Sequence, residues 1–151
     1  TVFGRASTVG DFSIIWHITG LLYAIGSMHR LHQAIALSIA LGAESIIVNQ
    51  GVKRIFRRER PTVSGDDRFD VRTPSTSSFP SGHASSATVA AIILIWMTGF
   101  PLAILWIIMA GVVALSRVVV RIHHLSDIVG GVITGAILGA IAVPIISSIL
   151  G

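Results

Sequence analysis

Apolar residues run along this chain in five long segments, separated by polar stretches of very different length. The segments cover residues 12–28, 33–52, 84–99, 101–120 and 128–150. Each has about the length that an α-helix needs to cross a hydrocarbon core of roughly 30 Å. Backbone groups inside lipid must be hydrogen-bonded within their own segment, which favours helices. The pattern therefore predicts an all-α fold: one domain over residues 1–151, built as a polytopic transmembrane bundle with five spans.

Short turns are expected at residues 28–33 and around Gly99, whereas residues 53–80 are expected to form a long polar loop.

In the last segment Gly131, Gly135 and Gly139 are four residues apart, so they share one face of a helix. Small residues in this pattern allow two membrane helices to approach closely. We expect the last helix to pack tightly against a neighbour along this face.

Composition supports a membrane protein. Hydrophobic residues make up 52% of the 151 residues and charged residues 12%, with a mean hydropathy of +0.82, well above that of a soluble domain. The absence of cysteine excludes disulfides and thiol chemistry. The N-terminus shows no signal-peptide pattern, so none is expected in this chain.

The net charge of +4 has an uneven distribution. If the five segments cross in order, Arg30 lies on one side, and the other ten of the eleven Lys and Arg residues lie on the side of the long loop. The positive-inside rule places that side in the cytoplasm, unless these cations bind phosphate instead. The basic residues do not alternate with exposed aromatics, so we expect anionic lipid or phosphate as the partner and not nucleic acid.

Three sequence patches on the long-loop side carry candidate chemistry. The first is KRIFRRERP, in which Lys53 and Arg60 are seven residues apart. In a continuous helix that spacing is two turns, so the two cations would face the same way and could clamp an anion. The alternative is a basic cluster that reaches into the lipid headgroup layer.

The second patch is FPSGH, where Pro80 precedes an expected helix start. Ser81 suits the N-cap position, Gly82 permits close backbone approach, and His83 lies in the first turn. Unpaired N–H groups and the positive dipole end make such a terminus a fitting site for phosphate. The alternative is an ordinary helix start with an interfacial histidine.

The third patch, SRVVVRIHHLSD, runs from Ser116 to Asp127. If a helix begins near His123, Asp127 lies one turn further on and can hold one ring nitrogen, leaving the other free to attack an electrophile. Alternatively, Asp127 is a helix cap or orients His124.

Together the three patches resemble the signature motifs of the type 2 phosphatidic acid phosphatase family, in order and in spacing. The matching residues are Lys53, Arg60 and Pro61 in the first motif, Pro80 to His83 in the second, and Ser116, Arg117, His123 and Asp127 in the third. Integral-membrane members usually have six spans, so this chain is expected to have the family fold without its first helix.

The resemblance implies a role for each residue. His123 would be the nucleophile that forms a phosphohistidine, Asp127 would orient it, and His83 would act first as acid and then as base. The implied phosphate-binding residues are Lys53, Arg60, Ser81, Gly82 and Arg117. No metal and no cofactor is expected, because these donors can supply the positive charge that a metal would supply.

The implied function is hydrolysis of a lipid phosphomonoester or pyrophosphate, of the phosphatidate, phosphatidylglycerophosphate or polyprenyl phosphate type, by an integral enzyme of a bacterial plasma membrane. Alternatives are a non-catalytic bundle that binds or transports lipid phosphates, and a lipid phosphotransferase. A vanadate-dependent haloperoxidase would share the site, but such proteins are soluble. Oligomeric state and the substrate's leaflet stay open.

Two further features have competing interpretations. The loop at 63–78 is either a headgroup-reading lid or an ordinary solvated loop, and its charged residues are Asp66, Asp67, Arg68, Asp70 and Arg72. Glu44 lies mid-span, where an ionisable residue is a functional candidate that could pair with His17. A protonated glutamate that faces the bundle interior would explain Glu44 equally well.

Overall fold

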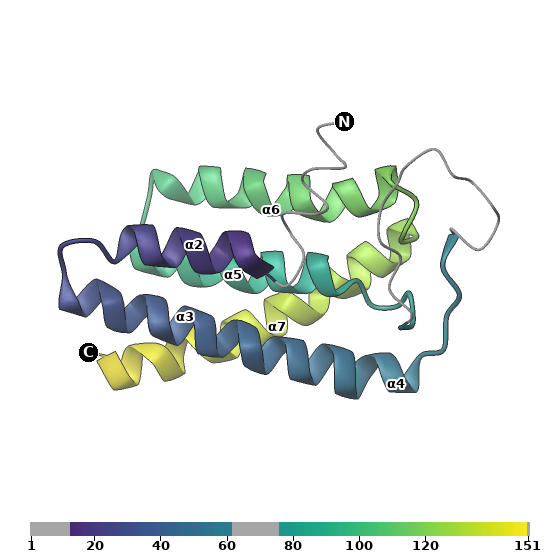
Figure 1. The fold of residues 1–151 in the computed structure, drawn as a ribbon, viewed down its shortest axis with the longest axis horizontal. Helices are drawn as coiled ribbons and strands as arrows, with labels where there is room; N and C mark the ends of the chain where they lie inside the picture. The colour runs from purple at the N-terminus through teal and green to yellow at the C-terminus, as the bar shows by residue number, and fades with distance from the viewer. Residues whose placement is uncertain (1–12, 62–75, 151) are drawn as a thin grey trace.

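The computed structural model describes residues 13–61 and 76–150, and these residues form helices and no strands (Figure 1). The helices are α2 (Ile14–Tyr23), α3 (Met28–Ile46), the π-helical η2 (Ile47–Val52), α4 (Lys53–Ile55), α5 (Gly82–Thr98), α6 (Leu102–Val119) and α7 (Leu125–Leu150). Because α3, η2 and α4 follow one another without a break, they form one rod from Met28 to Ile55. The prediction of an all-α bundle is confirmed.

Helix α5 is the centre of the bundle. It packs against α7, α6 and α3, and ten of its 17 residues are buried. A helix that is apolar or small on all sides is expected in such a position. Its contact with α7 is very close, since a β-carbon on Gly131 would lie 2.9 Å from the Ala84 Cβ and one on Gly135 2.8 Å from the Thr88 Cβ. The predicted tight packing along the glycine face is confirmed.

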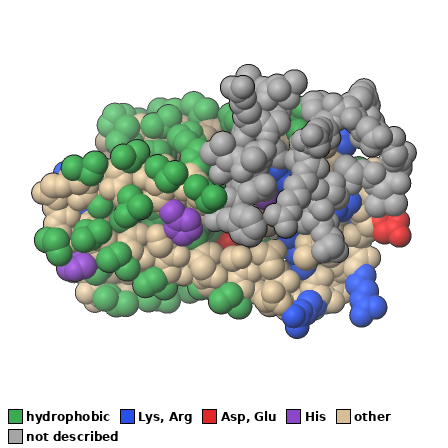
Figure 2. Space-filling model, viewed as in Figure 1, with side chains coloured by type: hydrophobic (Ala, Val, Ile, Leu, Met, Phe, Trp, Pro, Cys, Tyr) green, Lys and Arg blue, Asp and Glu red, His purple; other side chains and the backbone are tan. Residues whose placement is uncertain are grey.

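The outer surface of the bundle is strongly apolar. Large side chains such as Ile107 and Ile133 are more than half exposed, and Figure 2 shows hydrophobic side chains spread over much of the visible face, with most visible Lys and Arg towards one end. Within residues 13–61 and 76–150, three helices are long and apolar enough to cross a membrane: Met28–Ile55, Leu102–Val119 and Leu125–Leu150. The protein is therefore an integral membrane protein. Helices α2 and α5 are shorter, and the division into five spans stays a prediction.

The first turn lies earlier than the predicted residues 28–33. Helix α2 ends at Tyr23, Gly26 has φ of 82°, and the Ser27 hydroxyl accepts a hydrogen bond from the Arg30 amide at 3.4 Å. A left-handed glycine followed by an N-cap serine starts α3 at Met28. The polar residues after Met28 belong to the first turn of α3, although the sequence pattern had placed them in a loop.

Candidate active site

All three sequence patches meet at one end of the bundle, the right-hand end in Figure 1. The end of the α3–α4 rod, the starts of α5 and α7, and the turn after α6 come together there. The backbone N–H of Ser81 donates to the carbonyl oxygen of Asp127 at 2.9 Å, which ties the start of α5 to the start of α7. The second and third patches are thus joined directly through the backbone.

The prediction that Lys53 and Arg60 lie two turns apart on one continuous helix was wrong. The helix ends at Ile55, and Phe56 is already extended, with φ of −101° and ψ of 110°. Lys53 therefore reaches the site from a helix, whereas Arg60 reaches it from non-helical chain. Both side chains are nevertheless buried at the same end, at 9% and 7% exposure.

Arg60 donates hydrogen bonds from all three nitrogens of its guanidinium. Nε bonds to the Thr76 carbonyl at 3.1 Å, and NH2 bonds to the Ser77 carbonyl at 3.2 Å and to the Thr76 hydroxyl at 3.5 Å. NH1 bonds to the Ile122 carbonyl at 3.2 Å and to His123 Nε2 at 3.2 Å. Arg60 thus holds the chain at 76–77 against the turn that carries His123.

The expected helix start at the second patch is confirmed. Ser81 is the N-cap of α5, and its hydroxyl accepts a hydrogen bond from the Ala84 amide at 3.4 Å. The amine of Lys53 lies beside this terminus, because a β-carbon on Gly82 would be 3.5 Å from Lys53 Nζ. His83 is half-buried in the first turn of α5.

Asp127 performs both of the tasks that the sequence left open. Helix α7 begins at Leu125, and Asp127 Oδ2 accepts a hydrogen bond from the His124 amide at 2.9 Å, as a residue in a capping box does. The same oxygen lies 3.5 Å from His123 Nδ1. Asp127 therefore fixes both the start of the helix and the ring of His123.

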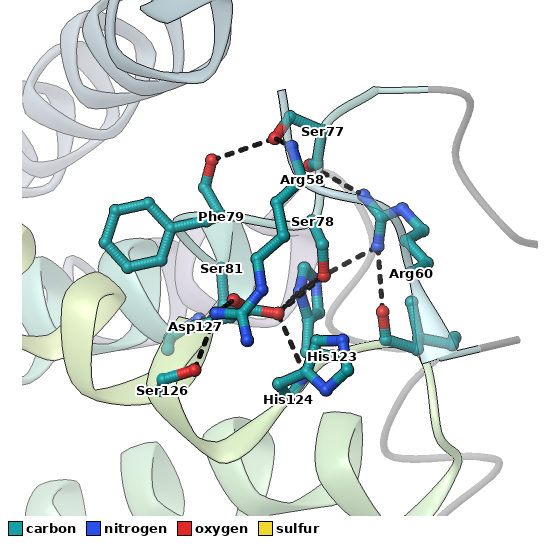
Figure 3. A network of polar contacts seen from close by, with 12 residues as sticks. Arg58, Arg60, Ser77, Ser78, Phe79, Ser81, His123, His124, Ser126 and Asp127 are labelled. Atoms are coloured by element: carbon teal, nitrogen blue, oxygen red, sulfur yellow. Dashed lines mark hydrogen bonds and ion pairs between the residues drawn. The ribbon is translucent and has the colours of Figure 1, made fainter. Parts of the chain in front are cut away.

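Sequence reasoning missed two residues that bind Asp127 (Figure 3). The Ser78 hydroxyl donates to Asp127 Oδ2 at 2.5 Å and lies 3.4 Å from His123 Nδ1. Arg58 NH1 bonds to Asp127 Oδ1 at 2.9 Å and to the Ser126 hydroxyl at 2.6 Å. The density of cations in the first patch was a signal for Arg58, but helical spacing cannot select a residue from extended chain.

The contact with Arg60 defines the protonation state of His123. A guanidinium can only donate, so Nε2 must carry a lone pair and the ring proton must reside on Nδ1, which faces Asp127 and Ser78. Burial lowers the pKa of His123, and the positive charges of Arg60, Arg117 and Lys53 lower this pKa further. His123 is therefore a neutral imidazole at physiological pH.

Arg117 contributes to the site through both its charge and its backbone. It is 1% exposed in the last turn of α6, and its carbonyl accepts hydrogen bonds from the amides of Ile122 and His123 at 3.1 and 3.2 Å. Arg117 thus fixes the turn that carries the candidate nucleophile and adds a buried cation beside it.

Two other expectations have different outcomes. The suggested pairing of Glu44 with His17 was wrong: His17 Nδ1 lies 2.9 Å from the Ser38 hydroxyl, and Glu44 faces Lys53 and Ser85 instead.

The charged loop residues from Asp66 to Arg72 lie outside the described residues. Within residues 13–61 and 76–150, the His, Asp and Glu side chains form no group of three that could hold a metal ion.

Comparison with known proteins places this arrangement in a family. The model of the PAP2 superfamily matches residues 32–149, which include all three patches. The chain belongs to the PAP2 superfamily. This agrees with the resemblance seen in the motifs.

Two relatives of this chain are named as phosphatases. A decaprenylphosphoryl-5-phosphoribose phosphatase of Mycobacterium tuberculosis is 39% identical over 136 residues, covering 89% of this chain and 73% of the relative. The protein of the same name from Mycolicibacterium smegmatis is 41% identical over 96 residues, covering 62% of this chain and 51% of the relative.

The fold also has a solved counterpart. The crystal structure of a transmembrane PAP2 type phosphatidylglycerolphosphate phosphatase from Bacillus subtilis matches with a TM-score of 0.70 and 22% identity. The match covers 98% of this chain and 76% of that protein. The two proteins therefore share the same arrangement of helices.

Proposed function

We propose that the protein is an integral-membrane lipid phosphate phosphatase that works through a phosphohistidine on His123. One observation carries the proposal: His123 Nε2 has a lone pair and faces NH1 of Arg60 at 3.2 Å, while Nδ1 faces Asp127 at 3.5 Å. A nucleophile held from behind by a carboxylate and facing a cation is the arrangement that phosphoryl transfer requires.

In the first step Nε2 of His123 attacks phosphorus, and the bond from phosphorus to the lipid oxygen breaks. We assign the proton for the leaving oxygen to His83, in the first turn of α5. As Nε2 bonds to phosphorus, the ring becomes positive, and the Asp127 carboxylate stabilises that charge through Nδ1–H. The NH1 proton of Arg60 that now faces Nε2 becomes available to a phosphoryl oxygen.

In the second step a water molecule attacks the phosphohistidine. His83, now neutral, takes a proton from this water, the nitrogen–phosphorus bond breaks, and inorganic phosphate leaves. His123 and His83 then return to their starting protonation states. The reaction consumes one water and releases one alcohol and one phosphate.

The charge that builds on the phosphoryl group is met by groups of the chain itself. Lys53, Arg60 and Arg117 provide three buried positive charges, and Ser81 with Gly82 provides the amide end of α5. Preorganised donors of this kind commonly contribute most to catalysis. We therefore propose turnover that does not need a metal ion.

For the substrate, we propose a phosphomonoester on a polyprenyl-linked lipid. Two relatives at 39% and 41% identity are named decaprenylphosphoryl-5-phosphoribose phosphatases. The apolar outer surface next to the site also suits a substrate whose chain stays in the bilayer. A bacterial plasma membrane is the location that fits such a lipid.

The test is release of inorganic phosphate by detergent-purified protein in the presence of EDTA. The panel consists of decaprenylphosphoryl-5-phosphoribose, undecaprenyl phosphate, phosphatidylglycerophosphate and phosphatidate. We expect release by the wild-type chain, none by His123→Ala, and normal release by His124→Ala, which removes the neighbouring imidazole. Trapping of 32P on wild-type protein but not on His123→Ala would identify the intermediate. Equal activity of His123→Ala and wild type would contradict the proposal.

A further inference from the structure

The π-helical turn η2 determines where Lys53 points. The buried residues Leu37, Leu41, Glu44 and Val48 follow one another at steps of four, three and four, the spacing of one α-helical face. The next buried residue is Lys53, five positions after Val48, and its backbone N–H bonds to the Val48 carbonyl. In an uninterrupted α-helix, five residues would turn Lys53 about 140° away from Val48. The wide turn keeps Lys53 on the buried face instead.

This turn brings the lysine to the start of α5. Lys53 Nζ would lie 3.5 Å from a β-carbon on Gly82, and the Asn49 side-chain oxygen would lie 3.6 Å from the same point. Lys53 shares this end of the bundle with Arg60 and Arg117, and the three positive charges repel one another. Without an anion in the site, this repulsion favours movement of the flexible Lys53 side chain away from the other two.

Glu44 is the buried acid on the same face of the rod. Its side chain is 3% exposed, and its carboxylate is close enough to attract Lys53 electrostatically. It also lies against Ser85, one turn into α5. Among the described residues, however, neither Glu44 Oε1 nor the Ser85 hydroxyl has a partner with hydrogen-bond geometry. The steps proposed for His123 and His83 make no use of this carboxylate.

We propose that Glu44 is a positioning residue for Lys53: the negative charge of its carboxylate attracts the ammonium group from the same buried face of the rod and keeps it near the start of α5, ready for the phosphoryl group. The inference rests on the proposed function, because it assigns Lys53 to phosphate. A negative charge on Glu44 offsets part of the repulsion that Lys53 experiences from the other two cations, so the lysine is positioned before substrate arrives.

Two substitutions at position 44 distinguish the contribution of the negative charge from the contribution of side-chain packing. Glu44→Gln keeps the shape and removes the charge, whereas Glu44→Asp keeps the charge and leaves a small void. We expect Glu44→Gln to lower kcat/KM by on the order of tenfold, because the Lys53 ammonium group loses the nearby negative charge that attracts it. Glu44→Asp should retain more activity than Glu44→Gln. A purely structural role for Glu44 would give the opposite order.

A double-mutant cycle shows whether Glu44 acts through Lys53. In a Lys53→Ala background, Glu44→Gln should cause no further loss of kcat/KM, since its target has gone. Gln33→Ala is the matched control, because Gln33 is another buried polar residue of α3, 7% exposed, in the part of the helix distant from Lys53. Full activity of Glu44→Gln, or losses that multiply in the double variant, would overturn the positioning role.

Binding of inorganic phosphate separates this inference from the proposed function. Phosphate that binds the folded protein raises its unfolding temperature. We expect this rise to be smaller in Glu44→Gln than in wild type and equal to wild type in Gln33→Ala. If wild type releases no phosphate from any lipid, the proposed function fails, but the binding measurement still decides the role of Glu44. An equal rise in Glu44→Gln and wild type would overturn that role.

Discussion

Nε2 of His123 lies 3.2 Å from NH1 of Arg60, and this contact connects the candidate nucleophile to the group that would hold its substrate. Since Arg60 must donate, the contact keeps Nε2 unprotonated and the ring proton on Nδ1. The protonated Nδ1 then faces Asp127 and Ser78. One guanidinium thus fixes the chain at 76–77, the turn after α6 and the imidazole of the candidate nucleophile.

Replacing Arg60 by lysine should abolish most activity although the charge is kept. The three N–H groups of a lysine all belong to one nitrogen atom. A lysine therefore cannot donate at once to the carbonyls of Thr76 and Ser77 and to that of Ile122, as the planar guanidinium does. We expect kcat to fall by about 100-fold or more, the typical cost of a lost transition-state donor, together with a lower unfolding temperature. Arg54→Lys is the control, because Arg54 is exposed and bonds to Gln50. Near-normal kcat in Arg60→Lys would contradict the assignment.

Ser78 should act on the rate and not on substrate binding. Its hydroxyl donates to Asp127 Oδ2 and can accept from His123 Nδ1, so Ser78→Ala loosens the orientation of the imidazole. We expect kcat to fall roughly tenfold with KM little changed, which corresponds to about 1.4 kcal/mol. The matched control is Ser77→Ala, whose hydroxyl bonds to the Arg58 amide and the Phe79 carbonyl. Equal effects of the two substitutions would show a general loop defect instead.

The lowered pKa of His123 predicts a loss of stability in acid. Its folded-state pKa lies below the ordinary value of 6.5, so between the two values the unfolded chain binds more protons than the folded chain. The contribution of His123 to stability is therefore complete above about pH 6.5 and declines below it, by at most about 1.4 kcal/mol per pH unit. The free energy of unfolding of His123→Asn, measured in detergent, should fall less steeply from pH 6.5 to 5 than that of wild type, and equal slopes would contradict the lowered pKa.

Much of this molecule could be predicted from its sequence, for identifiable reasons. Long apolar segments indicate burial in lipid, so they located the helices, and the glycine spacing in α7 predicted a close contact, which the structure shows to be with α5. Rules for neighbouring residues predicted the Ser81 cap and the pairing of His123 with Asp127, because residues within one helical turn have nearly fixed relative positions.

Contacts across the fold could not be predicted in the same way. The chain leaves the helix at Ile55, and from there residue spacing no longer determines which face a side chain takes. Arg58 and Ser78 reach Asp127 across 69 and 49 residues of sequence, and no local pattern encodes these contacts. The π-turn was also hidden, since a single wide turn shifts Lys53 without altering the apolar character of the segment.

Gly135 should tolerate alanine poorly, and the reason connects packing to chemistry. A β-carbon there would meet the Ser85 carbonyl and would lie 2.8 Å from the Thr88 Cβ, so α5 and α7 would have to separate. We expect Gly135→Ala to lower the free energy of unfolding by about 1–3 kcal/mol, the usual cost of overpacking. In contrast, a β-carbon on Gly111 of α6 would have no described neighbour within 4 Å. Gly111→Ala should therefore be neutral or stabilising by up to about 1 kcal/mol, since alanine favours helix.

Gly135→Ala should also slow catalysis, because α5 carries His83 and α7 carries Asp127, which lies behind His123. Separation of the two helices by a few tenths of an ångström would misalign the proposed acid and the proposed nucleophile, and such misplacement is costly for a preorganised site. Thermal unfolding in detergent and kcat of the same preparations provide the measurement, with Gly111→Ala alongside. A Gly135→Ala protein that is as stable and as active as Gly111→Ala would show that α5 and α7 can separate without cost, and that their close contact does not set the geometry of the site.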